Sequence, residues 1–464
     1  MSDPLKVAEL RAFIAKRTAP KPRSSPPSGF RLLSLPPELI VEIFLHCVAR
    51  APPLTMFDEA PMILLSICRK LRSIAVSSPT LWRSFTPASS SAHLVEFADL
   101  WFSRARGVPV SLQLTLPNAG DEYVDVVERY AARIGSLTMH CSIRVYYALA
   151  ARRPEFPLLR RAQFSLRRGG NLDQLETTQE LDLLKSAPIL ESVWISGIPL
   201  SALALPSTHI TEFMAYTRPT SEYFDGIRKL PSLLSCRLGH ILTGDDRDSP
   251  PMLCHPAIRE LSLDKNHDGG PEGASHQLLH LLILPALESL SIGFNDNLDL
   301  APIASLVERS KCALRKLTVM SGAHKLLVDS ISSFRALHHL SGLALTTPCS
   351  ATLNSLFDLF GTDVEFLPRL QELKIISEGK KDDDLQDLFR QSAASFFKRA
   401  ELASAGPVNG VQVIQLRSFR VEIRLRLHEQ LNLPGMAELL LPFLELRQKG
   451  MDIHVGGRGG NSMI

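Results

Sequence analysis

The chain has 464 residues, of which 45% are hydrophobic and 21% are charged, a balance that is typical of a folded globular protein and excludes an intrinsically disordered one. Its 51 basic and 48 acidic side chains leave a formal net charge of +3, too small a field to make nucleic acid or an anionic membrane the main partner. The length allows two to four ordinary domains, or one small module followed by an elongated array.

The seven cysteines are scattered, odd in number and mostly set in apolar runs. Buried thiols in a reducing compartment fit this distribution better than a disulfide framework does. The longest apolar run, Leu278–Leu287, is far too short to span a bilayer. We therefore expect a cytoplasmic and/or nuclear protein that has no membrane partner.

Residues 1–30 are expected to form a short helix and then a Pro/Ser linker. The basic and apolar side chains of this helix leave a mitochondrial presequence as the alternative. Asp3 and Glu9 argue against that alternative, because such presequences are poor in acidic residues.

The stretch 31–86 predicts three short helices. Pro36 and Pro37 favour a helix start, because proline lacks the N–H that a first turn leaves unsatisfied. A second helix is expected from Leu64 to Ala75, and Ser78 is expected to cap a third. The first helix carries apolar side chains at a spacing that fills one face, namely Leu39, Ile40, Ile43, Phe44 and Cys47. So small a core is marginal alone, which favours a partner surface.

These residues resemble an F-box domain, in the form with a longer first loop that is common in mushroom-forming fungi. The resemblance covers roughly an eighth of the chain and rests on the runs Leu35–Leu39, Ile43–Phe44, Ile67–Lys70 and Ser78–Trp82. It implies that residues 31–86 bind the Skp adaptor and, through it, the cullin scaffold of an SCF-type ubiquitin ligase. The residues that match the motif, and would form or support the adaptor surface, are Leu35, Pro36, Glu38, Leu39, Ile43, Phe44, Ile67, Cys68 and Trp82.

Residues 87–430 repeat a short motif of the form L-x-x-L-x-L. The interval between its starts runs from 20 residues (Leu190 to Ile210) to 31 residues (Leu159 to Leu190). The ten starts are Ile134, Leu159, Leu190, Ile210, Leu233, Ile258, Leu287, Leu314, Leu340 and Leu370. This array resembles leucine-rich repeats, although the asparagine expected after the strand is missing from nearly every copy.

Each copy of the motif predicts a short strand whose alternate side chains point inward, and an intervening helix, such as 300–310, that closes the copy. A buried aliphatic side chain contributes about 1.5–3 kcal/mol, so one copy cannot offset the entropy lost on its own ordering. We predict an α/β fold in which a three-helix module precedes a leucine-rich-repeat-like solenoid with a parallel strand array. The irregular spacing leaves an ordinary α/β domain as the alternative.

In this register the strand positions between the inward residues form an exposed surface. Trp and Tyr are residue types that dominate binding hot spots. A shift of the register by one residue would instead bury Trp194, so that outcome stays open. The predicted partner-binding residues are Trp194, Tyr216, Arg237, Lys316 and Lys374.

Three further elements are expected after the ten copies. Residues 419–427 alternate as one more strand, and residues 434–449 predict a helix that caps the array. The glycine-rich tail 456–460 is expected to be disordered. The C-terminal region 431–464 would therefore hold a capping helix and a flexible tail.

The chain shows no local motif for metal binding or catalysis. Cys236, His240, Cys254 and His255 lie within twenty residues but lack the spacing of a zinc site, and Cys236 is expected in the core. The pair His338–His339 is expected to have a structural or surface role. Phosphate-loop, nucleophile-elbow and zinc-protease motifs are missing, so we expect no cofactor and no catalytic residue.

Three functions remain at this point. The leading hypothesis is a non-catalytic substrate receptor of an SCF-type ubiquitin ligase, whose array selects a protein for degradation. The second is a protein-binding repeat scaffold without a ligase role; it stays open because Leu71 stands where F-box domains very often have a tryptophan. The third, an enzyme with a non-local site, has no supporting motif, although catalytic triads need not be local.

Overall fold

The computed structural model describes residues 32–48, 60–87, 94–115, 121–166, 181–206, 208–242, 251–264, 274–294, 300–321, 333–346, 350–377, 382–408, 410–423 and 436–457. The chain is α/β, and these residues form twelve α-helices and a parallel sheet of fourteen strands. It divides into two compact units: Ser24–Ser235, the N-terminal unit, and a C-terminal unit that includes Cys236–Ile464. Among the described helices none has both the length and the apolar content to cross a bilayer. The helix and linker predicted for residues 1–30 lie outside the described residues.

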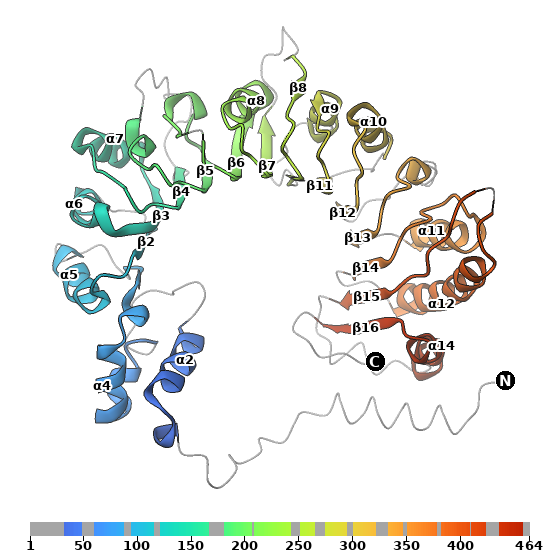
Figure 1. Ribbon diagram of the computed structural model, residues 1–464, viewed down its shortest axis with the longest axis horizontal. Helices are drawn as coiled ribbons and strands as arrows, with labels where there is room; N and C mark the ends of the chain where they lie inside the picture. Colours follow the sequence, from blue (N-terminus) through green and yellow to red (C-terminus); the bar gives the residue numbers. More distant parts are fainter. Residues whose placement is uncertain are drawn as a thin grey trace. The chain divides into compact units, whose positions relative to one another are not determined.

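The N-terminal unit begins with a helical module, by which we mean the described residues from Leu32 to Phe85 (Figure 1). Its helices are α2 (Pro37–Cys47), α3 (Leu64–Ile67), α4 (Arg69–Ser77) and the 3-10 turn η2 (Pro79–Trp82). The predicted helix start at Pro36 and Pro37 is confirmed. The single helix predicted from Leu64 to Ala75 is wrong, because Cys68 has an extended backbone (φ −159°) that separates α3 from α4.

The side chains of α2 are divided between core and surface. Ile40 and Phe44 are buried in the core of the module, and α2 packs against α4. Leu39 and Ile43, both predicted to form or support an adaptor surface, are exposed. Cys47 is exposed as well. The reason is the thinness of the module, which offers α2 only one side to pack against.

The last residues of the module join it to the sheet. Strand β1 (Ser84–Phe85) pairs in parallel with β2 (Val110–Leu114), and α5 (Leu94–Ala105) connects them. The fully buried Trp82 lies edge-on to Trp101 of α5, with ring centroids 5.0 Å apart. The indole Nε1 of Trp82 donates to the Ala75 carbonyl (2.8 Å), and that of Trp101 donates to the Ser84 carbonyl (2.9 Å). Packed aromatic rings therefore fasten the module to the first strands.

The rest of the N-terminal unit alternates strands with helices or irregular connections. Its further elements are α6 (Asp121–Tyr130), β3 (Ile134–Cys141), α7 (Ile143–Arg152), β4 (Arg161–Leu166), β5 (Ser192–Ser196), β6 (Glu212–Pro219) and α8 (Thr220–Arg228). The strand order β1-β2-β3-β4-β5-β6 follows the chain. Helices α5 to α8 all lie on one side of these strands (Figure 1).

The C-terminal unit repeats this plan. Its elements are β7 (Ser235–Leu242), β8 (Leu253–Cys254), β9 (Glu260–Leu263), α9 (Ala274–His280), β10 (Leu282–Ile283), β11 (Ser289–Phe294), α10 (Ala301–Ser310), β12 (Lys316–Ser321), β13 (Gly342–Thr346), α11 (Ser350–Thr362), β14 (Glu372–Ser377), α12 (Asp382–Ser404), β15 (Ser418–Ile423), α14 (Met436–Gln448) and β16 (Asp452–Gly457). Strands β8 and β10 form a separate parallel pair. The order β9-β11-β12-β13-β14-β15-β16 again follows the chain.

Every one of the ten motif copies forms a strand, as predicted. Equivalent side chains of neighbouring copies pair in register, as Leu290, Leu317 and Leu343 do in β11, β12 and β13, and all three are buried. The chain-ordered, parallel stacking within each unit is solenoid-like, which favours this prediction over an ordinary α/β domain. The array continues beyond the predicted capping helix, because β16 pairs with β15.

The end of the chain departs from the sequence prediction. The helix predicted over 434–449 is present as α14 (Met436–Gln448), and the strand predicted over 419–427 is present as β15 (Ser418–Ile423). Gly456 and Gly457, predicted to be disordered, are the last residues of β16. They have register partners in Glu422 and Ile423 of β15. The remainder of the tail lies outside the described residues.

A ladder of backbone hydrogen bonds runs along the edge of the sheet where the strands begin. The carbonyl of the residue before a strand accepts two N–H groups from the next copy. The Arg315 carbonyl accepts from Ser341 (2.8 Å) and Gly342 (2.9 Å), and the Gln371 carbonyl accepts from Arg417 (2.8 Å) and Ser418 (2.9 Å). The ladder sets the register of each copy against its neighbour and aligns the residues that precede the strands.

The contrast between Trp82 and Trp194 gives a test of this packing. Trp82→Ala should destabilise the N-terminal unit by about 3–5 kcal/mol, because it empties a fully buried site. The matched variant Trp194→Ala removes a ring that is only half-buried, so its thermal midpoint should stay near that of the wild type. Thermal unfolding followed by circular dichroism should show a fall of roughly 10 °C for Trp82→Ala alone. Equal falls for both variants would contradict the assigned register.

Candidate protein-binding surfaces

The helical module exposes a set of large apolar side chains. Leu39 is 51% exposed, Ile67 is 58% exposed and Ile43 is 36% exposed. Leu33, Ile63 and Val76 of the same module are exposed too. Scattered apolar side chains are normal on a protein surface, but six on one module of about fifty residues make the module a candidate docking surface.

The residues predicted to bind an adaptor therefore fall into two groups. Pro36, Glu38, Leu39, Ile43 and Ile67 are exposed, so a partner can contact them directly. Phe44 and Trp82 are 2% and 0% exposed, so they support the module from inside. Leu35 and Cys68 are half-buried.

Leu71 occupies the position where a tryptophan is common in F-box domains. Its side chain is 3% exposed and lies in the core of the module with Ile74 and Ala75. Leucine therefore fills this position as a core residue. Trp82 of the module makes its aromatic contact with Trp101 of α5.

A second surface of the N-terminal unit is the strand face, by which we mean the side of the strands opposite the helices. Val193 and Ile195 of β5 are buried, whereas Trp194 between them is half-exposed on this face. Trp194 pairs in register with Met214 of β6, and its ring lies 5.8 Å from that of Tyr216. The structure thus places the two predicted aromatic residues side by side.

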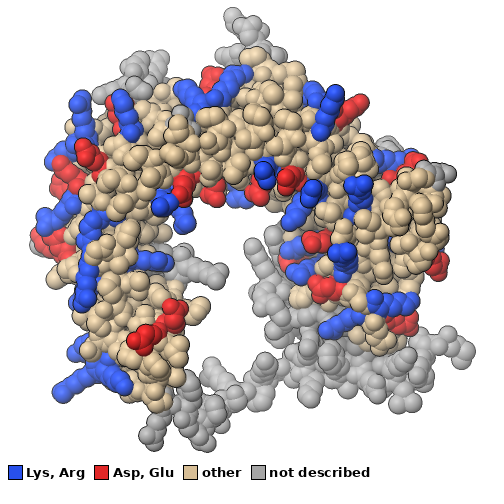
Figure 2. Space-filling model, viewed as in Figure 1, with Lys and Arg blue, Asp and Glu red and all other residues tan. Residues whose placement is uncertain are grey.

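The strand face of the C-terminal unit is polar. The three predicted cationic residues all lie on it, with Arg237 and Lys316 exposed and Lys374 half-buried. Arg237 lies 3.8 Å from Asp264 and Lys374 lies 2.7 Å from Glu422. Figure 2 shows the blue and red side chains intermixed along these strands. Because most of the charges are already paired, this face carries no strong field of one sign.

No protein-family model and no curated protein matches the sequence. The function is therefore argued from the geometry of these surfaces and from the motifs of the sequence.

A buried polar cluster on β3 and β4 was weighed as a catalytic site. His140 Nδ1 and Ser165 Oγ lie 2.7 Å apart, and a Ser–His contact can activate a nucleophile. Ser165 is nearly buried, and its backbone N–H donates to the hydroxyl of Tyr146 (3.0 Å). That hydroxyl donates to the Met139 carbonyl (2.8 Å). Within the described ranges His140 has no carboxylate partner to orient it, so we assign the cluster a structural role.

The four residues considered for zinc are dispersed. Cys236 is buried in β7, as predicted, His255 is buried near β8, and Cys254 is exposed. In the part of the chain that the structure describes, no group of three His, Cys, Asp or Glu residues is placed to hold a metal ion. Among the described cysteines Cys141, Cys236 and Cys312 are buried, as predicted, whereas Cys68 is half-buried and Cys47 and Cys254 are exposed, so the prediction of buried thiols holds only in part.

Alkylation can test which thiols are accessible. Burial raises the pKa of Cys141 and of Cys236 to about 12, so neither is a thiolate at pH 8, and the thiolate is the reactive species. Iodoacetamide at pH 8 should modify the exposed Cys47 and Cys254 of the native protein and spare the two buried thiols. Peptide mass spectrometry reads the sites, with protein unfolded in urea as the control in which all four react. Modification of Cys141 as fast as Cys47 in the native protein would contradict the assignment.

Proposed function

We propose that this protein is a substrate receptor of an SCF-type ubiquitin ligase and carries out no chemistry itself. In this proposal the helical module is an F-box that binds the Skp adaptor, and through it the cullin scaffold, while leucine-rich-repeat-like copies bind the protein to be ubiquitinated. The observation that carries it is the exposure of Leu39, Ile43 and Ile67 on a module whose sequence resembles an F-box.

The module buries some apolar side chains and exposes others, and this division supports the proposal. A docking module needs apolar side chains held outward on a core that does not deform. Leu39 and Ile43 project from the same helix that buries Ile40 and Phe44. The Lys70 ammonium also donates to the Leu33 carbonyl (2.7 Å), which ties α4 to the start of the module. The exposed residues are thus presented on a fixed frame, which reduces the entropy lost on binding.

The attachment of the module to the sheet supports the receptor role as well. A receptor must hold its target at a fixed distance from the scaffold that delivers ubiquitin. Trp82, Phe85 and Trp101 form a buried aromatic cluster across the junction, with the Phe85 and Trp101 centroids 5.8 Å apart. This cluster gives the N-terminal unit a stiff connection between its module and the strand face that bears Trp194.

The second candidate is a repeat scaffold that binds protein partners without a ligase. The sequence leaves this candidate open because Leu71 stands where F-box domains very often have a tryptophan. A scaffold would use the same strand face to bind its partners but would not contact the Skp adaptor. Binding of the adaptor therefore separates the two candidates.

Co-purification with the Skp adaptor tests the docking half. The double variant Leu39→Ala, Ile67→Ala should reduce adaptor recovery at least about tenfold, because it removes two apolar anchors. The thermal midpoint should change little, since both side chains are exposed. The matched control is Leu100→Ala on α5, which removes an apolar side chain that is 64% exposed outside the module. The receptor proposal fails if wild type and double variant recover equal adaptor, or if wild type recovers none.

The recognition half has its own test. In cells that lack the chain, its targets should accumulate, and quantitative mass spectrometry identifies them. Wild type should restore their turnover, and the double variant Trp194→Ala, Tyr216→Ala should not, although it still binds the adaptor. Turnover restored equally by both proteins would remove the aromatic pair from target binding.

A further inference from the structure

The C-terminal unit contains a cavity of about 890 Å³ at the edge where strands β12 to β15 begin. Three guanidinium groups and two imidazoles line it: Arg315, Arg335, Arg369, His338 and His339. We call it the basic pocket. Its five basic residues come from the segments that precede three successive strands, β12, β13 and β14. The two histidines were expected from the sequence to have only a structural or surface role. Its volume is that of a typical small-molecule site.

The positive charge of the basic pocket is only partly compensated. In the ladder along this edge, Arg259 lies 3.8 Å from Glu288, and Arg160 contacts Glu191 in the N-terminal unit. Arg315 stands directly before β12, as Arg259 stands directly before β9. The equivalent residue of the next copy, however, is Ser341, which has no carboxylate to pair with the guanidinium. Among the described residues neither Arg315 nor Arg369 has a carboxylate within ion-pair distance. Glu365 is the one acidic residue on the described lining.

The contacts of His339 show that it lies in a positively charged environment. Arg369 Nη1 lies 3.3 Å from His339 Nδ1, and because a guanidinium can only donate, the imidazole accepts and is neutral. The rings of His338 and His339 lie 4.2 Å apart. Burial, then His338, Arg369 and Arg315, lower the pKa of His339. The charges of Arg315 and Arg369 both act on His339, so two guanidiniums of like charge line one cavity, as in sites that receive an anion.

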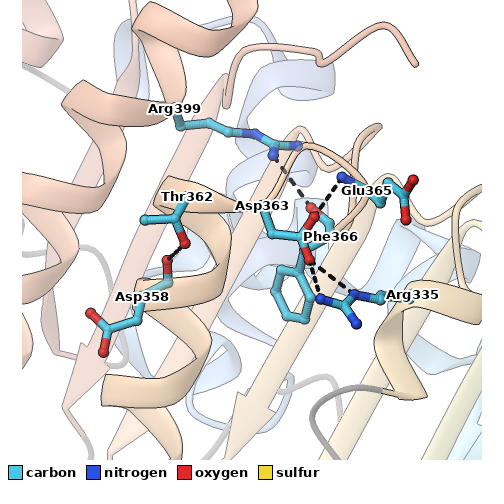
Figure 3. Close-up of polar contacts among 7 residues, drawn as sticks. All are labelled: Arg335, Asp358, Thr362, Asp363, Glu365, Phe366 and Arg399. Atoms are coloured by element: carbon cyan, nitrogen blue, oxygen red, sulfur yellow. Dashed lines mark hydrogen bonds and ion pairs between the residues drawn. The ribbon is translucent and has the colours of Figure 1, made fainter. Parts of the chain in front are cut away.

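The wall of the basic pocket is held from two sides (Figure 3). Arg335 donates through Nε (2.9 Å) and Nη2 (2.6 Å) to Asp363 Oδ2. Asp363 Oδ1 accepts from the Glu365 N–H (2.9 Å), and the Arg335 contact lowers the pKa of Asp363 against the opposing effect of burial. This ion pair anchors the segment that carries Glu365 and Arg369.

Arg399 of α12 holds the same segment from beneath. It is 1% exposed, and its guanidinium donates to the Phe366 carbonyl (3.3 Å) and the Leu367 carbonyl (2.6 Å). Leu367 has a left-handed backbone (φ +47°), a strained conformation that persists only where surrounding contacts hold it. Arg369 is therefore displayed on a preformed wall, which is what binding a small anion requires.

We propose that the basic pocket binds a phosphomonoester, with the guanidiniums of Arg315 and Arg369 on the phosphate. A phosphate dianion carries more charge than one carboxylate and matches the fork of a guanidinium. Val411 and Ile414, which also line the basic pocket, give an apolar surface for the organic part. The proposal does not depend on the ligase function, because the basic pocket lies in the C-terminal unit and the helical module lies in the N-terminal one.

Isothermal titration of the full chain with phenyl phosphate tests this proposal. Benzyl alcohol, which is neutral, should not bind, and benzoate, which carries one charge, should bind at least about tenfold more weakly. The double variant Arg315→Gln, Arg369→Gln should bind phenyl phosphate at least about tenfold more weakly than wild type. Arg259→Gln is the matched control: it changes an exposed arginine at the equivalent place before β9, outside the cavity. It should bind like the wild type.

A conservative variant guards against loss of the fold. Arg315→Lys, Arg369→Lys keeps both charges and should retain part of the affinity, whereas a structural defect would not distinguish lysine from glutamine. A phosphoserine peptide, titrated in parallel, distinguishes the source of the ester. Tighter binding of the peptide assigns a phosphorylated protein segment, and tighter binding of phenyl phosphate assigns a small molecule. Equal binding by wild type and the glutamine double variant, or no binding of either probe by wild type, overturns the proposal.

Discussion

The in-register stacking of parallel strands is the constraint on which the rest of this structure depends. A single copy buries only two or three aliphatic side chains on its strand, too few to offset its loss of conformational entropy. Neighbouring copies supply the missing contacts. Leu343 of β13, for example, has register partners in Leu317 of β12 and Leu373 of β14. The carbonyls of residues such as Arg315 and Gln371, each shared by two N–H groups of the next copy, hold that register. Stability therefore belongs to the stack rather than to any copy.

Stacking also decides what is exposed. Because helices or irregular connections cover one side of the strands, the residues between the buried positions form the other side, and Trp194 and Tyr216 are half-exposed for this reason. The first strand is short, and the helical module is continuous with it through Trp82 and Trp101. The module stabilises the beginning of the sheet, and its own thinness leaves Leu39 and Ile67 exposed. One arrangement thus produces both surfaces that the proposed receptor would use.

The basic pocket follows from the same ladder. Residues that precede the strands are brought into line along one edge, so their side chains become neighbours although they are far apart in the chain. Where arginine meets glutamate, as at Arg259 and Glu288, the charges pair. Where Arg315 is followed in the ladder by Ser341, the guanidinium has no carboxylate partner among the described residues, and in our proposal it binds a phosphate instead. The buried Arg399, whose pKa burial lowers to about 10, remains protonated at neutral pH and can keep the adjoining wall in place.

The sequence by itself determined the strands of the ten motif copies and β15, because each depends on an alternation within a few residues, and it determined the start of α2 through Pro36 and Pro37. It predicted Trp194 and Tyr216 on the exposed side of their strands, since the side-chain period of a strand is two, but left the register open, and the structure decided it. Only the tertiary structure decided that Cys68 interrupts a helix, that Leu39 faces outward while Ile40 faces inward, and that β16 extends the sheet. It alone assembled Arg315, His339 and Arg369, because contacts between copies join residues that no local pattern connects.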